Sequence, residues 1–299
     1  MNGTFKHYIF LNLTVFVWGF TGILGKEIDL DANKIVFFRT AIAFISLILL
    51  GIFLKKTAKL SRRQLGNVLA TGIIVGLHWF TFFQSIKMST VSVAVVCMSS
   101  STLFTALIEP LIFKRKLLFS EIVLSVFIVI GIGCIIGFEF EYILGIFVGL
   151  TSALLASLFN VLNGKFIQTM PAFQITKYEM LGGFLTMTLI LTFSGQINRG
   201  LFQVQLDDFI YLLILGLICT TAAFLVSVWL MKFLSPFTVS MGINMEPIYA
   251  IIIALILDYW RGVNTEQMSV GFYIGTLLII GSIFLNAYVK KKQLKAVKI

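Results

Sequence analysis

The stretch KMSTVSVAVVCMSSSTLFTALIEPLIF, residues 87–113, returns in outline as KFLSPFTVSMGINMEPIYAIIIALILD, residues 232–258. A shift of 145 residues superimposes the two stretches without a gap. The aligned pairs are Lys87 with Lys232, Thr102 with Pro247, Phe104 with Tyr249, and Ser120-Glu121 with Thr265-Glu266. A shorter shift would align two Glu-Pro pairs, but it loses the lysine pair, so we reject it. An internal repeat of long apolar segments is typical of membrane transporters.

Each half of the chain contains five apolar segments, each near the about 20 residues that a helix needs to span the hydrocarbon core. With 59% hydrophobic and 12% charged residues and a mean hydropathy of +1.00, a water-soluble globular protein is excluded. The first segment lacks a signal-peptide cleavage pattern, so we keep it as a span. The predicted spans are residues 8–25, 33–54, 65–85, 91–113, 120–137, 142–163, 174–193, 209–231, 238–257 and 268–289.

These segments predict an all-α membrane protein with ten transmembrane helices. We expect a first repeat over residues 8–137, a second over 142–289, and a basic cytoplasmic tail over 290–299. Because five is odd, the second repeat crosses the membrane in the opposite sense to the first. Inverted repeats of this kind enclose a central cavity that opens to either side by rocking.

The basic residues indicate the orientation. With the N-terminus in the cytoplasm, seventeen of the 23 Lys and Arg fall on the inner face, so both termini of this multi-pass protein are predicted to be cytoplasmic, in the cytoplasmic (inner) membrane. The net charge of +10 then reflects insertion and attraction to anionic membrane lipid, and we expect no nucleic-acid partner.

Motifs for metal binding and catalysis are missing. The three cysteines lie inside predicted helices and form no disulfide or metal spacing, so no metal site and no cofactor are expected. The chain contains no His-Glu-x-x-His, Gly-x-Ser-x-Gly or phosphate-binding glycine loop. It is not predicted to be an enzyme.

Several short motifs occur in a fixed order on these spans, and together the chain resembles the EamA-type branch of the drug/metabolite transporter superfamily over its whole length. The resemblance implies two EamA repeats and a ten-helix carrier, with several members exporting amino acids or other small metabolites. This chain has Thr102 where first repeats of the family often have proline, which leaves Pro110, lower down, to bend that helix. The motifs are Trp18-Gly19, Arg39, Thr102-Leu103-Phe104-Thr105-Ala106, Asn160-Val161-Leu162-Asn163 and Glu246-Pro247-Ile248-Tyr249.

Glu246 lies in the middle of the predicted ninth span. A carboxylate at that depth costs about 2.5 to 3.5 kcal/mol unless it faces a partner or water. Pro247 removes the N–H that would bond the carbonyl of Ile243, which predicts a kink there, and Asn244 adds a second polar group. We therefore expect a substrate site or gate at this stretch; the competing interpretation is a carboxyl group that hydrogen-bonds another helix in packing.

Five further residues are candidates for the substrate site. Trp18 and Tyr249 would form its apolar wall, with a lipid-facing position as the alternative for the indole. His78, Asn160 and Asn163 would orient the substrate by polar contacts, or else bond other helices.

Small residues spaced by four predict tight helix packing on the third, sixth and tenth spans. A glycine face within one bundle looks the same as one between protomers, so a homodimer stays open as a partner. These residues are Gly72 and Gly76, then Gly145, Gly149, Ala153 and Ser157, then Gly271 and Gly275.

Arg39 and Glu179 stand near the starts of the second and seventh spans. Either residue can act in a gate at its own membrane surface, for Arg39 with Asp29 or Asp31. The simpler interpretation is that both side chains snorkel to the interface, and Glu109 is interpreted in the same way.

The function predicted from these features is secondary transport of a small organic metabolite, an amino acid or related compound, out of the cell by alternating access. Phosphorylated substrates are disfavoured, because few cationic groups are expected at mid-membrane. A channel-like or structural membrane protein is the alternative, and an intramembrane enzyme is a weaker one.

Overall fold

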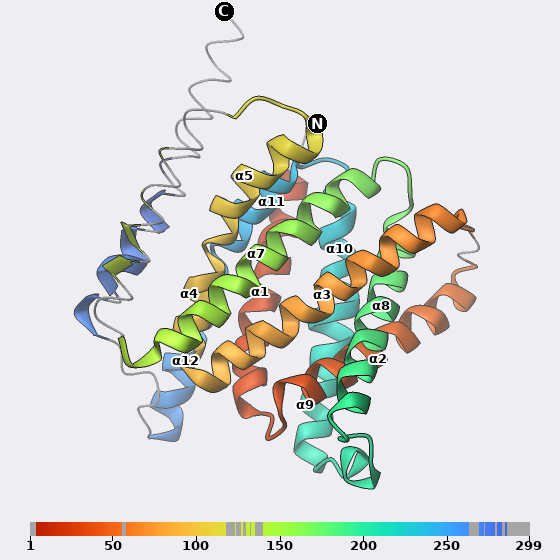
Figure 1. Cartoon of the computed structure of the whole chain (residues 1–299). Helices are drawn as coiled ribbons and strands as arrows, with labels where there is room; N and C mark the ends of the chain where they lie inside the picture. Colours follow the sequence, from red (N-terminus) through yellow and green to blue (C-terminus); the bar gives the residue numbers. More distant parts are fainter. Residues whose placement is uncertain are drawn as a thin grey trace, which may run out of the picture.

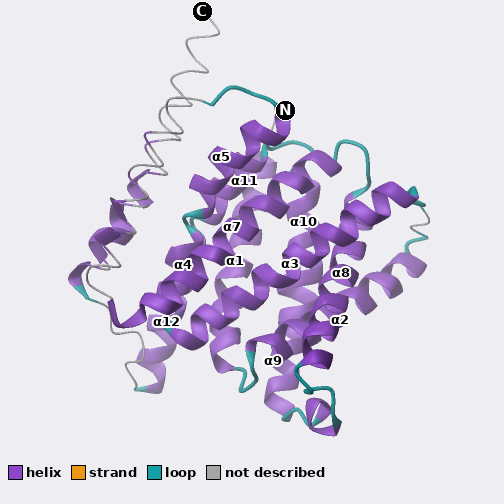
Figure 2. Cartoon of the chain, in the orientation of Figure 1, coloured by secondary structure: helices purple, strands orange, loops and turns teal. Residues whose placement is uncertain are grey.

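The computed structural model describes residues 4–55, 58–117 and 140–262, together with 123, 127, 130–131, 133–134, 269–271, 273–278, 280–282 and 285. In this part of the chain every regular element is a helix, as Figure 2 shows. The long helices pack into one bundle (Figure 1). They are α1 (Phe5–Glu27), α2 (Ala32–Phe53), α3 (Arg62–Met88), α4 (Val91–Met98), α5 (Ser101–Phe113), η1 (Phe140–Tyr142), α7 (Ile143–Phe166), α8 (Ala172–Phe193), η2 (Arg199–Phe202), α9 (Leu206–Gly216), η3 (Leu217–Ala222), α10 (Ala223–Leu230), α11 (Pro236–Ile243) and α12 (Glu246–Arg261).

Seven helical segments among the described residues are long and apolar enough to cross a membrane. The predicted seventh span, 174–193, corresponds to the 22-residue α8, which is long enough but is not one of these seven. The predicted fifth and tenth spans lie mostly, and the tail wholly, outside the described residues. The protein is thus all-helical and multi-pass, while the number ten stays a prediction. The seven segments are Phe5–Glu27, Ala32–Phe53, Arg62–Met88, Val91–Phe113, Phe140–Phe166, Leu206–Leu230 and Pro236–Arg261.

Two of these spans are interrupted at equivalent places. The first stops with α4 at Met98 and resumes with α5 at Ser101, and the second stops with α11 at Ile243 and resumes with α12 at Glu246. Both boundaries are separated by 145 residues, the shift at which the two sequences align. In Figure 1, α5 lies against α11 and α4 lies against α12, so the two interrupted spans run antiparallel. We call them the first and the second broken span.

Hydroxyl side chains interrupt the first broken span. The amides of Ser99 and Ser100 bond to carbonyls three residues back instead of four, and the Ser100 hydroxyl donates to the Cys97 carbonyl at 2.6 Å. Serine competes with the helix for backbone hydrogen bonds in this way. Pro110, the residue we expected to bend this span, lies inside the continuous α5.

The second broken span contains the interruption that Pro247 leads us to expect. α11 ends at Ile243, whose carbonyl would have needed the missing proline N–H, and Pro247 is in the first turn of α12. The Met245 amide bonds to the Gly242 carbonyl at 3.0 Å, a three-residue bond that closes the turn.

Glycines allow α3 to pack closely along α8. A methyl group at Gly72 would lie 2.5 Å from the carbonyl oxygen of Glu179, and one at Gly76 would lie 3.0 Å from the Cα of Gly183. On α7, a methyl group at Gly149 would lie 2.9 Å from the Cβ of Cys97. The prediction that these glycines serve tight helix packing is confirmed for α3 and α7.

Candidate functional site

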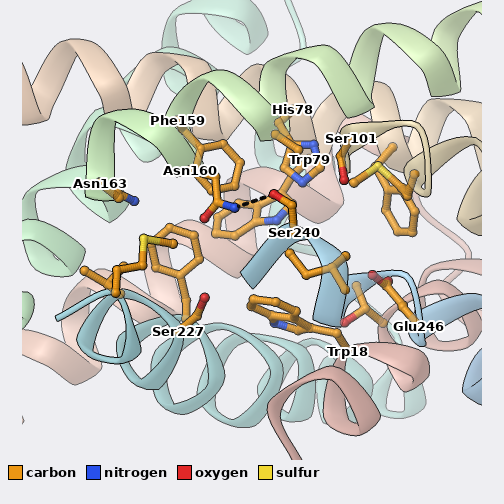
Figure 3. Close-up of a pocket in the computed structure, with 18 of the residues that line it drawn as sticks. Trp18, His78, Trp79, Ser101, Phe159, Asn160, Asn163, Ser227, Ser240 and Glu246 are labelled. Carbon is orange, nitrogen blue, oxygen red and sulfur yellow. Dashed lines mark hydrogen bonds between the residues drawn. The ribbon is translucent and has the colours of Figure 1, made fainter. Parts of the chain in front are cut away.

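A cavity lies where the two broken spans meet the rest of the bundle (Figure 3). Side chains from α1, α2, α3, α7 and α10 line it together with residues next to both breaks, Met98 and Ser101 at the first and Ile243 and Glu246 at the second. The space open to the centre of a water-sized molecule is about 60 Å³, enough for a few waters. The cavity is therefore narrow in this state.

Aromatic rings form most of the apolar wall. The ring centroids of Trp79 and Phe224 are 5.7 Å apart, and those of Phe159 and Phe224 are 5.8 Å apart. Trp18 also lines the cavity, and its indole N–H donates to the Cys219 carbonyl at 3.0 Å. The lipid-facing alternative for Trp18 is therefore wrong.

Arg39 is the charged residue that the sequence misplaced. It lies on α2 with 1% of its surface exposed and lines the cavity, so the expected snorkelling to the interface is wrong. Its Nε donates to the Thr220 hydroxyl at 2.6 Å, and its guanidinium lies 4.0 Å from the centroid of the Trp79 ring. Its Nη1 is buried and has no hydrogen-bond partner. Asp31, one of the gate partners considered, pairs with Lys34 at 2.7 Å.

The local backbone around Thr220 explains how Arg39 is held. η3 is a π-helical turn, in which the Thr220 hydroxyl donates to the Leu215 carbonyl at 2.7 Å, five residues back. Such wide turns inside helices are frequent at functional sites. The hydroxyl oxygen is thereby turned to accept from Arg39, leaving Nη1 as a free donor in the cavity wall.

The expectation of few cationic groups at mid-membrane was based on placing Arg39 at the surface. With Arg39 in the cavity, a negatively charged substrate group has a buried counter-ion. One guanidinium suits one carboxylate, which it can bind through two parallel hydrogen bonds.

Glu246 is the first residue of α12 and lines the same cavity, with 6% of its surface exposed. A carboxylate at a helix N-terminus is favoured by the helix dipole and by the free amides of the first turn. In Figure 3, Glu246 lies beside Trp18. The cavity thus contains one acidic and one basic side chain, and no salt bridge is found between them in the described part of the chain.

Asn160 reaches the cavity as part of a polar network. Its Nδ2 donates to the Ser240 hydroxyl at 2.9 Å, which also contacts the Thr105 hydroxyl at 2.9 Å (Figure 3). Asn244 is fully buried between the helices outside the cavity lining, and its Nδ2 donates to the Thr102 hydroxyl at 2.6 Å. Asn244 therefore connects the two breaks.

The remaining candidates divide between the cavity and its surroundings. His78 lines the cavity, and its Nδ1 lies 2.8 Å from the Ser152 hydroxyl. Asn163 also lines it, and donates to Glu179, which is fully buried behind it rather than at the interface. Tyr249 is not brought to the cavity, since its hydroxyl donates to the Asn12 side chain and its ring packs against Phe16.

Glu109, expected at the interface, is also buried, with 6% of its surface exposed. Its Oε2 accepts from the Phe237 amide at 2.8 Å and its Oε1 from Arg115 Nε at 3.2 Å. It therefore ties the end of α5 to the start of α11.

Several lining residues were missed from the sequence, and the internal repeat could have found some of them. Shifting Trp79 by 145 residues gives Phe224, and shifting Ser101 gives Glu246; all four line the cavity. Phe159 and Met231 carry no such signal, because apolar residues in apolar helices do not stand out.

No group of three His, Cys, Asp or Glu that could bind a metal ion is present among the described residues. The cavity instead offers hydrogen-bond donors, one charge of each sign and aromatic surface, which is the equipment for binding a small polar molecule.

The comparisons with known proteins agree with this geometry. The pattern of the EamA-like transporter family matches residues 5–137 and again 143–288. A protein of Clostridium kluyveri (strain ATCC 8527 / DSM 555 / NBRC 12016 / NCIMB 10680 / K1), described as an uncharacterized transporter, is 24% identical over 96% of this chain and 94% of its own length. A solved crystal structure superimposes with a TM-score of 0.68 over 95% of this chain and 98% of that chain, at 15% identity, which shows a shared fold alone.

Proposed function

Because the chain belongs to the EamA-like transporter family, we propose that this membrane transporter exports a small zwitterionic metabolite, an amino acid or a related compound, by alternating access. The observation that carries the proposal is the free Nη1 of Arg39 in the same cavity as the carboxylate of Glu246. A substrate with one carboxylate and one ammonium group gives each of them a partner.

The energetics favour such a substrate. A buried polar group without a hydrogen-bond partner costs about 1 to 3 kcal/mol, and more if it is charged. A substrate carboxylate on Arg39 would relieve that cost, and a substrate ammonium on Glu246 would do the same for the carboxylate. A phosphate dianion would need a second cation, so the preference against phosphorylated substrates is kept for this different reason.

The aromatic wall and the small volume favour a compact apolar side chain on the substrate. Trp18, Trp79 and Phe224 present ring faces and edges to the cavity, where apolar carbon is better placed than in water. His78 and Asn160 then orient the polar end.

Alternating access is supported by contacts between the halves at both ends of the bundle. At one end Arg261 pairs with Glu27 at 2.7 Å, and at the other Glu109 accepts from the Phe237 amide. Opening to either side requires one contact to break while the other holds. In the proposed ten-helix, inverted arrangement with cytoplasmic termini, the Glu109 contact lies at the cytoplasmic end.

The test is a binding screen on the purified protein in detergent, with amino acids, small amines and purine metabolites, followed by uptake into liposomes. We expect stabilisation by amino acids and saturable uptake, and we expect Arg39→Gln to weaken binding about 10- to 100-fold, the value of a hydrogen bond between charged groups. Thr21→Ala, a change at another lining position, is the matched control. A flat screen, or flux that does not saturate, would favour a channel-like or structural protein and sink the proposal.

A further inference from the structure

A second buried carboxylate, Glu179, lies directly behind the cavity wall. It is on α8 with none of its surface exposed, and its own backbone is pressed against Gly72 of α3. Its one hydrogen bond from a side chain comes from Asn163 Nδ2 to Oε2, at 3.2 Å. Because Asn163 lines the cavity (Figure 3), a single residue separates Glu179 from the transport path.

Two oxygens in this pair lack partners. Glu179 Oε1 and Asn163 Oδ1 are both buried and accept no hydrogen bond. A carboxylate and an amide carbonyl can only accept, so neither atom can satisfy the other while Glu179 is ionised. One proton on Oε1 would supply the missing donor, and the acid and the amide would then be joined by two hydrogen bonds.

No cation in the described residues compensates a charge on Glu179. The charged or titratable side chains on α8 and on the helices packed against it make other contacts or none that reach this carboxyl group. Arg39 bonds Thr220, His78 bonds Ser152, and the amine of Lys177 lies 4.5 Å from the ring centroid of Tyr178. The set is Lys34 and Arg39 on α2, Arg62, Arg63, His78 and Lys87 on α3, Lys165 on α7 and Lys177 on α8.

We propose that the Glu179–Asn163 pair is the proton site of this transporter, with Glu179 protonated in the present state and its proton exchanged for substrate. An unpaired buried carboxylate is too costly to persist, and protonation removes the cost. The inference rests on the proposed function, since it gives the carrier a coupled ion.

Asn163 connects the two binding events. While Glu179 is protonated, its O–H occupies Asn163 Oδ1; when the O–H bond breaks, the proton passes to water and the oxygen keeps the electron pair. Asn163 Oδ1 is then free to accept from a substrate ammonium in the cavity. Proton and substrate therefore compete, which is the requirement for antiport.

Infrared spectroscopy of the purified full-length protein tests the proton itself. At neutral pH we expect the C=O stretching band of a protonated carboxylic acid, absent in Glu179→Gln and retained in Glu246→Gln, which makes the same change on the cavity carboxylate. A band unchanged in Glu179→Gln, or lost in Glu246→Gln instead, overturns the proposal. If Glu179→Gln fails to fold, Asn163→Ala decides: we expect the acid band at higher frequency because its hydrogen bonds are lost, and an unshifted band overturns the pairing.

Coupling is tested in liposomes with a labelled mixture of the common amino acids and the membrane potential held at zero. Exchange of one proton for one substrate supports up to about tenfold accumulation across one pH unit, acidic inside. We expect the gradient to drive uptake in the wild type and not in Glu179→Gln; equal responses overturn coupling through Glu179. A wild type that transports none of the amino acids would sink the proposed function, whereas the infrared band would still decide the proton site.

Discussion

The two broken spans share a geometry but differ in chemistry. Both stop and resume at positions 145 residues apart, yet the first resumes at Ser101 and the second at Glu246. Serine hydroxyls interrupt the first, and a proline accompanies the interruption of the second. The repeat thus reproduces the shape of the cavity, while the charge that distinguishes one substrate end from the other is found on one half only.

Exchanging the residues at the two equivalent positions gives the largest expected effect. Glu246→Gln removes the carboxylate from the cavity and should weaken substrate binding about 10- to 100-fold, as for the loss of a hydrogen bond between charged groups. Ser101→Ala, at the same place in the first broken span, should change binding by less than about threefold. Dissociation constants from calorimetry on both variants check this. Similar losses at both positions would mean that the asymmetry of charge is irrelevant to binding.

The two ends of the bundle extend the comparison. Glu109 accepts from the buried Phe237 amide, and its removal leaves that N–H without a partner, at a cost of about 1 to 3 kcal/mol. The Glu27 and Arg261 side chains are 26% and 49% exposed, and exposed pairs contribute about 0.2 to 1 kcal/mol. Glu109→Ala should therefore open the cavity at its own end more than Glu27→Ala opens the other.

Thiol labelling measures this difference. A cysteine introduced as Ser227→Cys in the cavity wall, after replacement of the native cysteines, is treated with an impermeant reagent from either side of the membrane. We expect about tenfold faster labelling from the α11 end in Glu109→Ala, and less than about fivefold from the opposite end in Glu27→Ala. Faster labelling in Glu27→Ala than in Glu109→Ala would contradict the difference in burial.

The sequence predicted the depth of a residue along its helix better than the direction in which its side chain points. The 145-residue shift, the interruption at Pro247, and the positions of Trp18 and His78 all follow from patterns within a few turns of one helix. Arg39 and Glu179 were placed at the interface because each stands near the start of a helix, where snorkelling is inexpensive.

What brings these two side chains inward are partners far away in the chain. Arg39 meets Thr220, 181 residues later, through a π-helical turn that no local signal announces. Glu179 meets Asn163 because Gly72 lets α3 approach the α8 backbone closely. Tyr249 was missed for the reverse reason: its neighbour on α1, Gly19, admits its Cβ and directs its ring outward against Phe16.

The smallest expected effect asks what keeps the breaks open, and it separates proline from side-chain contacts. Asn244 at the second break is fully buried and donates to Thr102 beyond the first, so Thr102→Val leaves the amide without an acceptor and should cost about 1 to 3 kcal/mol of unfolding free energy. Pro247 lies in the first turn of α12, where the missing N–H is little needed, so Pro247→Ala should cost less than about 1 kcal/mol. Unfolding free energies of both variants in the same bicelles give the comparison. A larger loss in Pro247→Ala would mean that proline maintains the second break, and the serine-interrupted span would then need a different explanation from its partner.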